Sequence, residues 1–266
     1  MYDRFNRKIN YLRISVTDKC NLRCRYCMPE EGVRLLKHED ILSLEEIAEV
    51  ARISIGLGIH KIRITGGEPL VRKGVVYLAK MLSGIPGIRD IAMTTNGILL
   101  EKYAEQLKEA GLKRVNISLD TTDPEKYRYI TRGGDIYAVF KGIDAAHKAG
   151  LDPVKINCVV SKSSDEQDAQ AVKAFCDENN LAIRFIHRMD LQTGRFTIVE
   201  GGQGGNCSLC NRLRLTANGM IKPCLFSDLE FSVREYGIER AIRMAVDAKP
   251  EYGTVSMNNC FSKIGG

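Results

Sequence analysis

Residues 11–27 read YLRISVTDKCNLRCRYC, a short run rich in aliphatic and β-branched residues followed by three cysteines within eight residues. The run at 11–17 has the composition of a buried strand, and Cys20, Cys24 and Cys27 follow it as a C-x3-C-x2-C motif. A structural zinc ion usually takes four protein ligands, and a disulfide takes two cysteines. Three thiolates therefore leave one position open on the group that they hold, which is typical of a site that performs chemistry.

Five further runs of the same kind lie at residues 61–65, 90–95, 114–119, 153–160 and 182–187. Amphipathic helical patterns separate them, one starting after Ser43, one after Asp123, and others at about 99–110, 137–149 and 165–179. Strict alternation of strands and helices predicts a parallel sheet, and the short spacing favours an α/β fold, a partial (β/α)6 TIM-like barrel. Active sites of such barrels lie at the C-terminal ends of the strands, so the cysteine motif is expected at the active rim.

Two helix starts have recognisable caps. Ser43 is followed three residues later by Glu46, which is a capping box, and Asp123 precedes a proline at the first helical position. Both signals predict where a helix begins from local sequence alone.

The composition of the 266 residues suits a protein with a substantial core. No run of about 18 apolar residues is present, and the charged segment MYDRFNRKIN lacks the apolar stretch of a signal peptide, so we expect a soluble, cytoplasmic protein without a membrane partner. Nine cysteines in such a chain indicate metal binding rather than disulfides. The net charge of +6 fits either a solvated basic surface or a polyanionic substrate.

The pattern changes after residue 190, so two domains are expected: a barrel at 1–190 and a small C-terminal region at 191–266. The stretch that ends in GGQGGN has the composition of a loop. Two strand-like runs around an Ala-Asn-Gly turn then predict a hairpin, and a last helix is expected at about 236–248.

The C-terminal region contains a second cysteine triplet. Cys207, Cys210 and Cys224 form C-x2-C-x13-C, a spacing that by itself fits zinc as well as iron–sulfur. Arg212 and Arg214 follow the second cysteine at alternate positions, so both side chains face one way if this segment is a strand. Guanidinium groups suit phosphate and carbonyl oxygens.

The first cysteine motif and a glycine-rich turn together resemble a known superfamily. Three soft thiolates can hold three corners of a cubane iron–sulfur cluster, with a zinc site that borrows a distant fourth ligand as the alternative. C-x3-C-x2-C with Tyr26 before the third cysteine, and TGGEP at 65–69, resemble the marks of the radical S-adenosylmethionine (SAM) enzymes. The resemblance implies a 4Fe–4S cluster whose open iron binds SAM, which on reduction yields a 5'-deoxyadenosyl radical that takes a hydrogen atom from the substrate.

Within that superfamily the chain most resembles the GTP 3',8-cyclases of molybdenum cofactor biosynthesis. The similarity runs in order through LRISVTDKCNLRCRYCMPEEG, KIRITGGEPLVRK, TTNGILL, AGLKRVNISLD, CSLCNRLRLTANGMIKPCLF and the terminal IGG. It implies conversion of GTP to (8S)-3',8-cyclo-7,8-dihydroguanosine 5'-triphosphate, and a second 4Fe–4S cluster at the C-terminal triplet whose open iron binds the purine. It also implies a flavodoxin or ferredoxin as electron donor, a homodimer, and no nucleic-acid partner.

The same resemblance assigns residues to four groups. The expected cluster ligands are Cys20, Cys24 and Cys27 for the first cluster and Cys207, Cys210 and Cys224 for the second. The expected SAM contacts are Tyr26, Gly66, Gly67, Glu68, Ser118, Arg184 and Met189. The expected GTP contacts are Arg13, Arg63, Thr94, Lys155, Arg212 and Arg214, and the expected catalytic residues are Arg212, Arg214 and the terminal Gly265 and Gly266. Several cations pointing inward from barrel strands favour a triphosphate or a similar ligand, because buried charges without a partner are costly.

The chain also departs from that family. His187 and Asp190 replace an acidic residue and a proline, and only 16 residues separate Asp190 from Cys207. Cys260, near the C-terminus, is open to three interpretations: a fourth ligand of the second cluster, a redox thiol near the substrate, or an inert residue. Cys158 and Cys176 are expected in the core.

Two other functions compete with the cyclase. The first is a radical SAM enzyme with another substrate, either a peptide, as in the SPASM/twitch maturases, or a different nucleotide. The short segment at 191–206 and Cys260 would fit such an enzyme. A zinc-stapled RNA-binding module would use the positive charge, but the sequence has neither interleaved aromatic residues nor a concentrated basic stripe.

Overall fold

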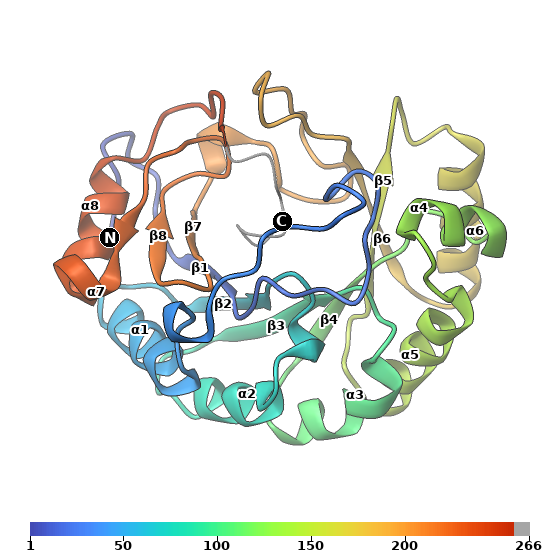
Figure 1. Ribbon diagram of the computed structural model, residues 1–266, viewed down its shortest axis with the longest axis horizontal. Coiled ribbons are helices and arrows are strands. Elements are labelled where there is room, and N and C mark those ends of the chain that lie inside the picture. The colour runs from blue at the N-terminus through green and yellow to red at the C-terminus, as the bar shows by residue number, and fades with distance from the viewer. Residues whose placement is uncertain (258–266) are drawn as a thin grey trace.

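The computed structural model describes residues 1–257, and all six predicted barrel strands form. They are β1 (Tyr11–Ser15), β2 (Lys61–Thr65), β3 (Asp90–Thr95), β4 (Arg114–Ser118), β5 (Lys155–Val160) and β6 (Ala182–His187). Neighbouring strands of this set pair in parallel and in sequence order. Figure 1 shows them curving around a central space, with the helices outside.

The helices that connect these strands cover the outer face of the sheet (Figure 1). They are α1 (Leu44–Gly56), α2 (Val75–Ser83), α3 (Leu100–Glu109), α4 (Pro124–Thr131), α5 (Ile136–Lys148) and α6 (Gln167–Glu178). The capping box of Ser43 and the Asp123 cap are both confirmed. Helix α2 was not among the expected helices, because Gly74 stands at its start and provides no side-chain cap.

The C-terminal strands continue the same sheet. After the short 3-10 helix η3 (Cys207–Leu209), β7 (Arg212–Leu215) pairs in parallel with β1, and β8 (Met220–Lys222) returns antiparallel to β7. The hairpin is therefore confirmed, and β9 (Phe231–Ser232), α7 (Val233–Tyr236) and α8 (Ile238–Asp247) follow it. The boundary expected at residue 190 stays a prediction, while the sheet itself runs on from β1 to β7.

Among the described residues, the sheet has the order β6-β5-β4-β3-β2-β1-β7-β8-β9 and does not close on itself. This confirms the partial barrel. Residues of β1 show why the strands form: Leu12 and Ile14 are fully buried in the core, whereas Tyr11 and Arg13 alternate with them and line the interior cavity. Cys158 and Cys176 are fully buried in the same core, as expected. None of the described helices has the length and apolarity to cross a membrane.

Candidate active site

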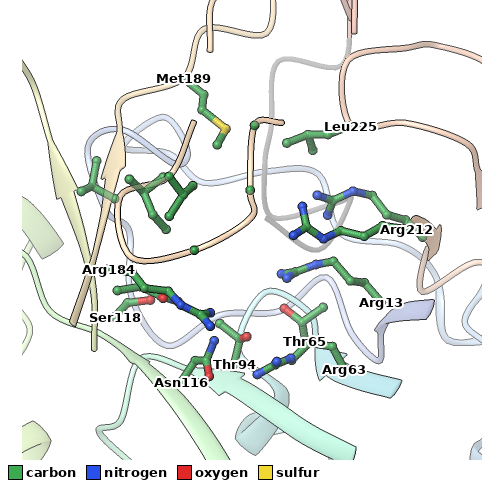
Figure 2. Close-up of a pocket in the computed structure, with 18 of the residues that line it drawn as sticks. Arg13, Arg63, Thr65, Thr94, Asn116, Ser118, Arg184, Met189, Arg212 and Leu225 are labelled. Atoms are coloured by element: carbon green, nitrogen blue, oxygen red, sulfur yellow. The ribbon is translucent and has the colours of Figure 1, made fainter. Parts of the chain in front are cut away.

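A cavity of about 660 Å³ occupies the concave side of the sheet. Both cysteine triplets line it, together with every expected SAM and GTP contact. Figure 2 shows Arg13, Arg63 and Arg212 projecting into this space, with Arg184 and Ser118 on the opposite side. The expected catalytic residues Gly265 and Gly266, and also Cys260, lie outside the described residues.

The first cysteine triplet lies on the loop that leaves β1. The Cys27 amide donates to the Cys24 carbonyl at 2.9 Å, and the Leu22 amide donates to the Cys20 sulfur at 3.4 Å. Burial raises the pKa of Cys24 to about 12, and the nearby Cys27, Asp120 and Cys20 add to the rise. Thiolates gathered so closely need positive charge, which iron provides, so the residues fit an iron–sulfur cluster.

The described residues contain no group of three or more His, Cys, Asp and Glu side chains close enough to share one metal ion. In a cubane cluster each thiolate binds a different iron atom, so the sulfur atoms stand farther apart than ligands of a single ion.

The turn that contains Gly66, Gly67 and Glu68 packs against this loop. The Gly67 amide donates to the Thr17 carbonyl at 2.7 Å, and the Glu68 amide donates to the Lys19 carbonyl at 2.8 Å. A Cβ on Gly67 would lie 2.3 Å from the Lys19 oxygen, so this close approach of two backbones requires glycine. The turn therefore holds the cysteine loop in place.

Glu68 is buried, and its carboxylate accepts three hydrogen bonds from the protein. The donors are the Leu70 amide at 3.0 Å, the Thr95 hydroxyl at 2.7 Å and the Asn96 amide at 2.7 Å. Burial raises the pKa of Glu68 to about 7 despite these bonds. Its observed partners are protein groups, and its contact with SAM stays a prediction.

Tyr26 is held by Asp120, which follows β4. The Tyr26 hydroxyl donates to Asp120 Oδ2 at 2.8 Å, and the Val159 amide donates to Oδ1 at 2.8 Å. Burial raises the pKa of Asp120 to about 6 and that of Tyr26 well above its ordinary value. This pair fixes the aromatic ring beside the first cysteine triplet.

Cationic side chains, with Tyr11 among them, form two rows across three adjacent strands. In one row Arg63, Arg13 and Arg214 are in register on β2, β1 and β7, and in the other Lys61, Tyr11 and Arg212 are in register on the same strands. Burial and the neighbouring Arg13 and Arg212 lower the pKa of Arg214 to about 9. So many like charges in one cavity fit a polyanionic ligand.

Tyr11 lies within this cationic group. Its hydroxyl accepts from Arg63 Nε at 3.1 Å, and the Arg212 guanidinium lies 5.7 Å from its ring centroid. Burial raises its pKa, but the charges of Arg63 and Arg13 outweigh burial and bring it down to about 8.

Polar residues continue the floor of the cavity across the other strands. Thr94, Asn116 and Lys155 are in register on β3, β4 and β5. Thr94 Oγ1, Asn116 Oδ1 and Arg63 Nη1 are buried without a hydrogen-bond partner among the described residues. Such atoms are rare in a finished core and indicate a site that a polar ligand completes.

The second cysteine triplet flanks the β7–β8 hairpin, with Cys207 and Cys210 before β7 and Cys224 after β8, and all three line the cavity. Lys249, which follows α8, donates to the carbonyls of Arg212 at 2.8 Å and Pro223 at 2.6 Å. Burial raises the pKa of Cys210, but Lys249 and Arg212 bring it below its ordinary value. At Cys224 burial outweighs Lys249 and raises the pKa of the thiol. The cationic setting therefore favours the thiolate at Cys210, which fits a metal ligand.

The shortened segment at 191–206 forms part of the cavity wall. Glycines 201, 202, 204 and 205 line the cavity, and Phe196 stacks on Phe226 with ring centroids 4.5 Å apart. Glu200 fastens the segment to the barrel, because its carboxylate contacts His187 Nε2 at 2.9 Å and accepts from the Ser164 hydroxyl at 2.7 Å. The segment is thus joined to the end of β6 through the contact between Glu200 and His187.

Several residues of the site were missed in the sequence analysis: Tyr11, Asn116, Asn157 and Lys249, which line the cavity, and Asp120, which holds Tyr26. Alternation along each strand could have indicated Tyr11, Asn116 and Asn157, since they share a face with Arg13, Ser118 and Lys155. Lys249 gave no signal, because a lysine just after a helix is usually exposed.

The chain matches the family profile described as the Radical SAM superfamily over residues 14–176. Among solved structures, Streptococcus suis SuiB bound to precursor peptide SuiA has a TM-score of 0.67 at 16% identity, over 93% of this chain and 66% of that chain. The structure of anSMEcpe with bound AdoMet has a TM-score of 0.63 at 16% identity, over 91% of this chain and 81% of that chain. These two likenesses show the fold alone, and together with the profile they place the protein among the radical SAM enzymes.

Similar proteins of known name show which family of radical SAM enzymes the chain belongs to. A protein named GTP 3',8-cyclase from Moorella thermoacetica is 47% identical over 88% of this chain and 86% of its own length. Another of that name from Alkaliphilus oremlandii is 41% identical over all of both chains. The chain belongs to the GTP 3',8-cyclase family, and it is an enzyme that uses a 4Fe–4S cluster and SAM. The Moorella alignment runs over 279 residues, more than the 266 of this chain, so that relative contains residues that this chain lacks.

Proposed function

We propose that this protein is a GTP 3',8-cyclase that forms (8S)-3',8-cyclo-7,8-dihydroguanosine 5'-triphosphate in the first step of molybdenum cofactor biosynthesis. The substrate is taken from the name of the relatives. The observation that most supports a GTP substrate is the in-register row of Arg63, Arg13 and Arg214. These arginines line the same cavity as both cysteine triplets. A nucleoside triphosphate combines the polyanion that suits these arginines with a ribose and a base.

Cys20, Cys24 and Cys27 would hold the first cluster, which with SAM supplies the radical chemistry of the superfamily. All seven predicted SAM contacts line the same cavity, and their role remains our proposal: Tyr26, Gly66, Gly67, Glu68, Ser118, Arg184 and Met189. Asp120 orients Tyr26, and the glycine turn fixes the loop.

The predicted GTP contacts divide into two groups in this proposal. Arg13, Arg63 and Lys155 bind the phosphates from the floor of the cavity, where they face its interior. Thr94 on β3 offers a buried hydroxyl oxygen that has no partner among the described residues. Arg212 and Arg214 adjoin the second triplet, so they are placed to act on the base as well as to bind it.

Cys207, Cys210 and Cys224 would hold a second 4Fe–4S cluster beside the guanine base. The support is the buried cationic setting that Lys249 and Arg212 create around the Cys210 thiol. Gly265 and Gly266 complete the proposed catalytic set from the part of the chain outside the described residues. A flavodoxin or ferredoxin as electron donor, a homodimer and a cytoplasmic location also remain predictions.

Anaerobic turnover tests this function directly. The reconstituted protein is mixed with GTP, SAM and dithionite, and the cyclised nucleotide and 5'-deoxyadenosine are measured by mass spectrometry. We expect both products in the wild type and neither in Cys24→Ala. Cys176→Ala is the matched control, because this cysteine is buried in the core and does not line the cavity.

Two results would separate the cyclase from its competitors. Cleavage of SAM without any cyclised nucleotide would point to another substrate, such as a peptide. A colourless zinc protein that binds no SAM would contradict the whole assignment.

A further inference from the structure

We propose that Lys249 is the positioning and charge-balancing residue of the second cysteine triplet, and that its ammonium group raises the reduction potential of the cluster bound there. This role rests on the proposed second cluster and concerns a residue that neither cysteine motif contains.

The position of Lys249 ties together the two sequence segments that bear the triplet. Its side chain is 1% exposed, and its Nζ donates to the Arg212 and Pro223 carbonyls at 2.8 and 2.6 Å. Arg212 comes two residues after Cys210, and Pro223 directly precedes Cys224. A single ammonium therefore bridges the backbone segments that carry Cys210 and Cys224.

The charge of Lys249 has no carboxylate to balance it among residues 1–257. Its described hydrogen-bond partners are the two carbonyls, and its charge acts to lower the pKa of the Cys210 thiol. A buried ammonium with neutral partners only is costly, so the arrangement requires an anion beside it. Thiolates that hold an iron–sulfur cluster provide that negative charge at the place where the ammonium points.

Lys222, on β8, provides an internal comparison. Its side chain is equally buried at 0% exposure, but its Nζ lies 3.4 Å from Glu230 Oε2. That lysine is balanced by a carboxylate, whereas Lys249 has none beside it within residues 1–257. The difference indicates that Lys249 serves the triplet rather than general packing.

The consequence for the cluster follows from electrostatics. One-electron reduction adds negative charge to the cluster, and a nearby buried cation stabilises the reduced form more than the oxidised form. Lys249 therefore raises the potential, and hydrogen bonding near the ligand sulfur acts in the same direction.

The test uses the full chain with Cys20, Cys24 and Cys27 all changed to Ala, so that only the second cluster assembles. Iron is counted after anaerobic reconstitution, and the midpoint potential is measured by a redox titration followed by electron paramagnetic resonance. Lys249→Met keeps the length of the side chain and removes its charge, Lys249→Arg keeps the charge, and Lys222→Met is the matched control.

We expect Lys249→Met to shift the midpoint potential of the cluster to more negative values or to lose iron. Lys249→Arg should restore most of the potential and of the iron content. Lys222→Met should leave the potential unchanged, even where it lowers the melting temperature. A Lys249→Met protein with full iron and an unchanged potential would overturn the role of Lys249 while leaving the cyclase proposal intact. If the parent protein without the first triplet binds no cluster, the second cluster fails and this role fails with it. GTP turnover by the protein with both triplets, measured separately, decides the cyclase proposal.

Discussion

Asp120 is a single residue on which burial and hydrogen bonding act in opposite directions. Its carboxylate accepts from Tyr26 and Val159, yet burial raises its pKa from 3.8 to about 6. A carboxyl group whose pKa rises on folding stabilises the fold through its protonated form. That contribution is complete below the ordinary pKa and is lost as the pH rises through the folded pKa.

Asp120→Asn tests this at the residue scale. The amide can keep both hydrogen bonds, because its oxygen can accept from Val159 and its nitrogen can donate to the Tyr26 hydroxyl. Its unfolding free energy relative to the wild type should increase between about pH 4 and pH 6 and then level off. Urea unfolding of the apoprotein at several pH values measures this difference, and a difference that is constant from pH 4 to pH 8 would contradict it.

Gly67 is the second residue that permits a sharp prediction. A methyl group there would meet the Lys19 carbonyl at 2.3 Å, so Gly67→Ala must displace the loop that begins the first triplet. We expect a loss of about 1–3 kcal/mol in unfolding free energy and reduced iron incorporation. The control is Gly56→Ala at the end of α1, where nothing lies within 4 Å of the added Cβ. Equal iron content in the two variants would show that the close approach of the Gly67 and Lys19 backbones is not needed for iron incorporation.

At the scale of elements, the segment at 191–206 is fastened to β6 mainly through Glu200. The Glu200 amide donates to the Phe185 carbonyl at 3.0 Å, and the Phe185 amide donates to the Glu200 carbonyl at 3.1 Å. The Glu200 carboxylate contacts His187 and Ser164. The backbone bonds do not depend on the side chain, whereas the carboxylate contacts do. The side chain therefore controls how firmly the wall of the cavity is held.

Glu200→Ala should loosen the segment with little loss of global stability. Glu200 is exposed and contacts a histidine and a hydroxyl, so losing these contacts costs about 0–1 kcal/mol and the melting temperature changes little. Trypsin should cleave faster after the exposed Arg195. Asp144→Asn removes a comparable exposed pair with Lys148 on α5 and should leave that cleavage rate unchanged. If both variants are cleaved alike, Glu200 does not fasten the segment.

At the scale of the whole molecule, the cavity concentrates positive charge from strands that are distant in the sequence. Arg13 on β1 lies between Arg63 on β2 and Arg214 on β7. The mutual repulsion of these groups opposes folding of the free protein, and a polyanion in the cavity removes it.

Inorganic triphosphate should therefore raise the melting temperature even without SAM or clusters. At one hundred times its Kd, a ligand stabilises the folded state by about 2.7 kcal/mol. Arg63→Met should lower the affinity for triphosphate at least tenfold, whereas Arg89→Met, an equal change of charge at an exposed site outside the cavity, should not. Thermal shift titrations measure both, and a wild type that does not respond to triphosphate contradicts a phosphate-binding cavity.

The amino-acid sequence by itself determined the strands, the helix caps and both cysteine triplets. Strand composition and alternation predicted β1 to β6, and Ser43 and Asp123 marked two helix starts, because strands and caps depend on residues that are close in the chain. The motif spacing and the family resemblance also named the residues that now line the cavity. Local signals failed at α2, where Gly74 provides no side-chain cap.

Only the tertiary structure decided how those residues meet. The parallel pairing of β7 with β1 aligns Arg13 with Arg214, some 200 positions away, and the packing of α8 brings Lys249 under the second triplet. Glu200 and His187 likewise meet through a contact between two segments. Pairing register and burial are set by the packing of the whole chain, so no local pattern in the sequence could predict them.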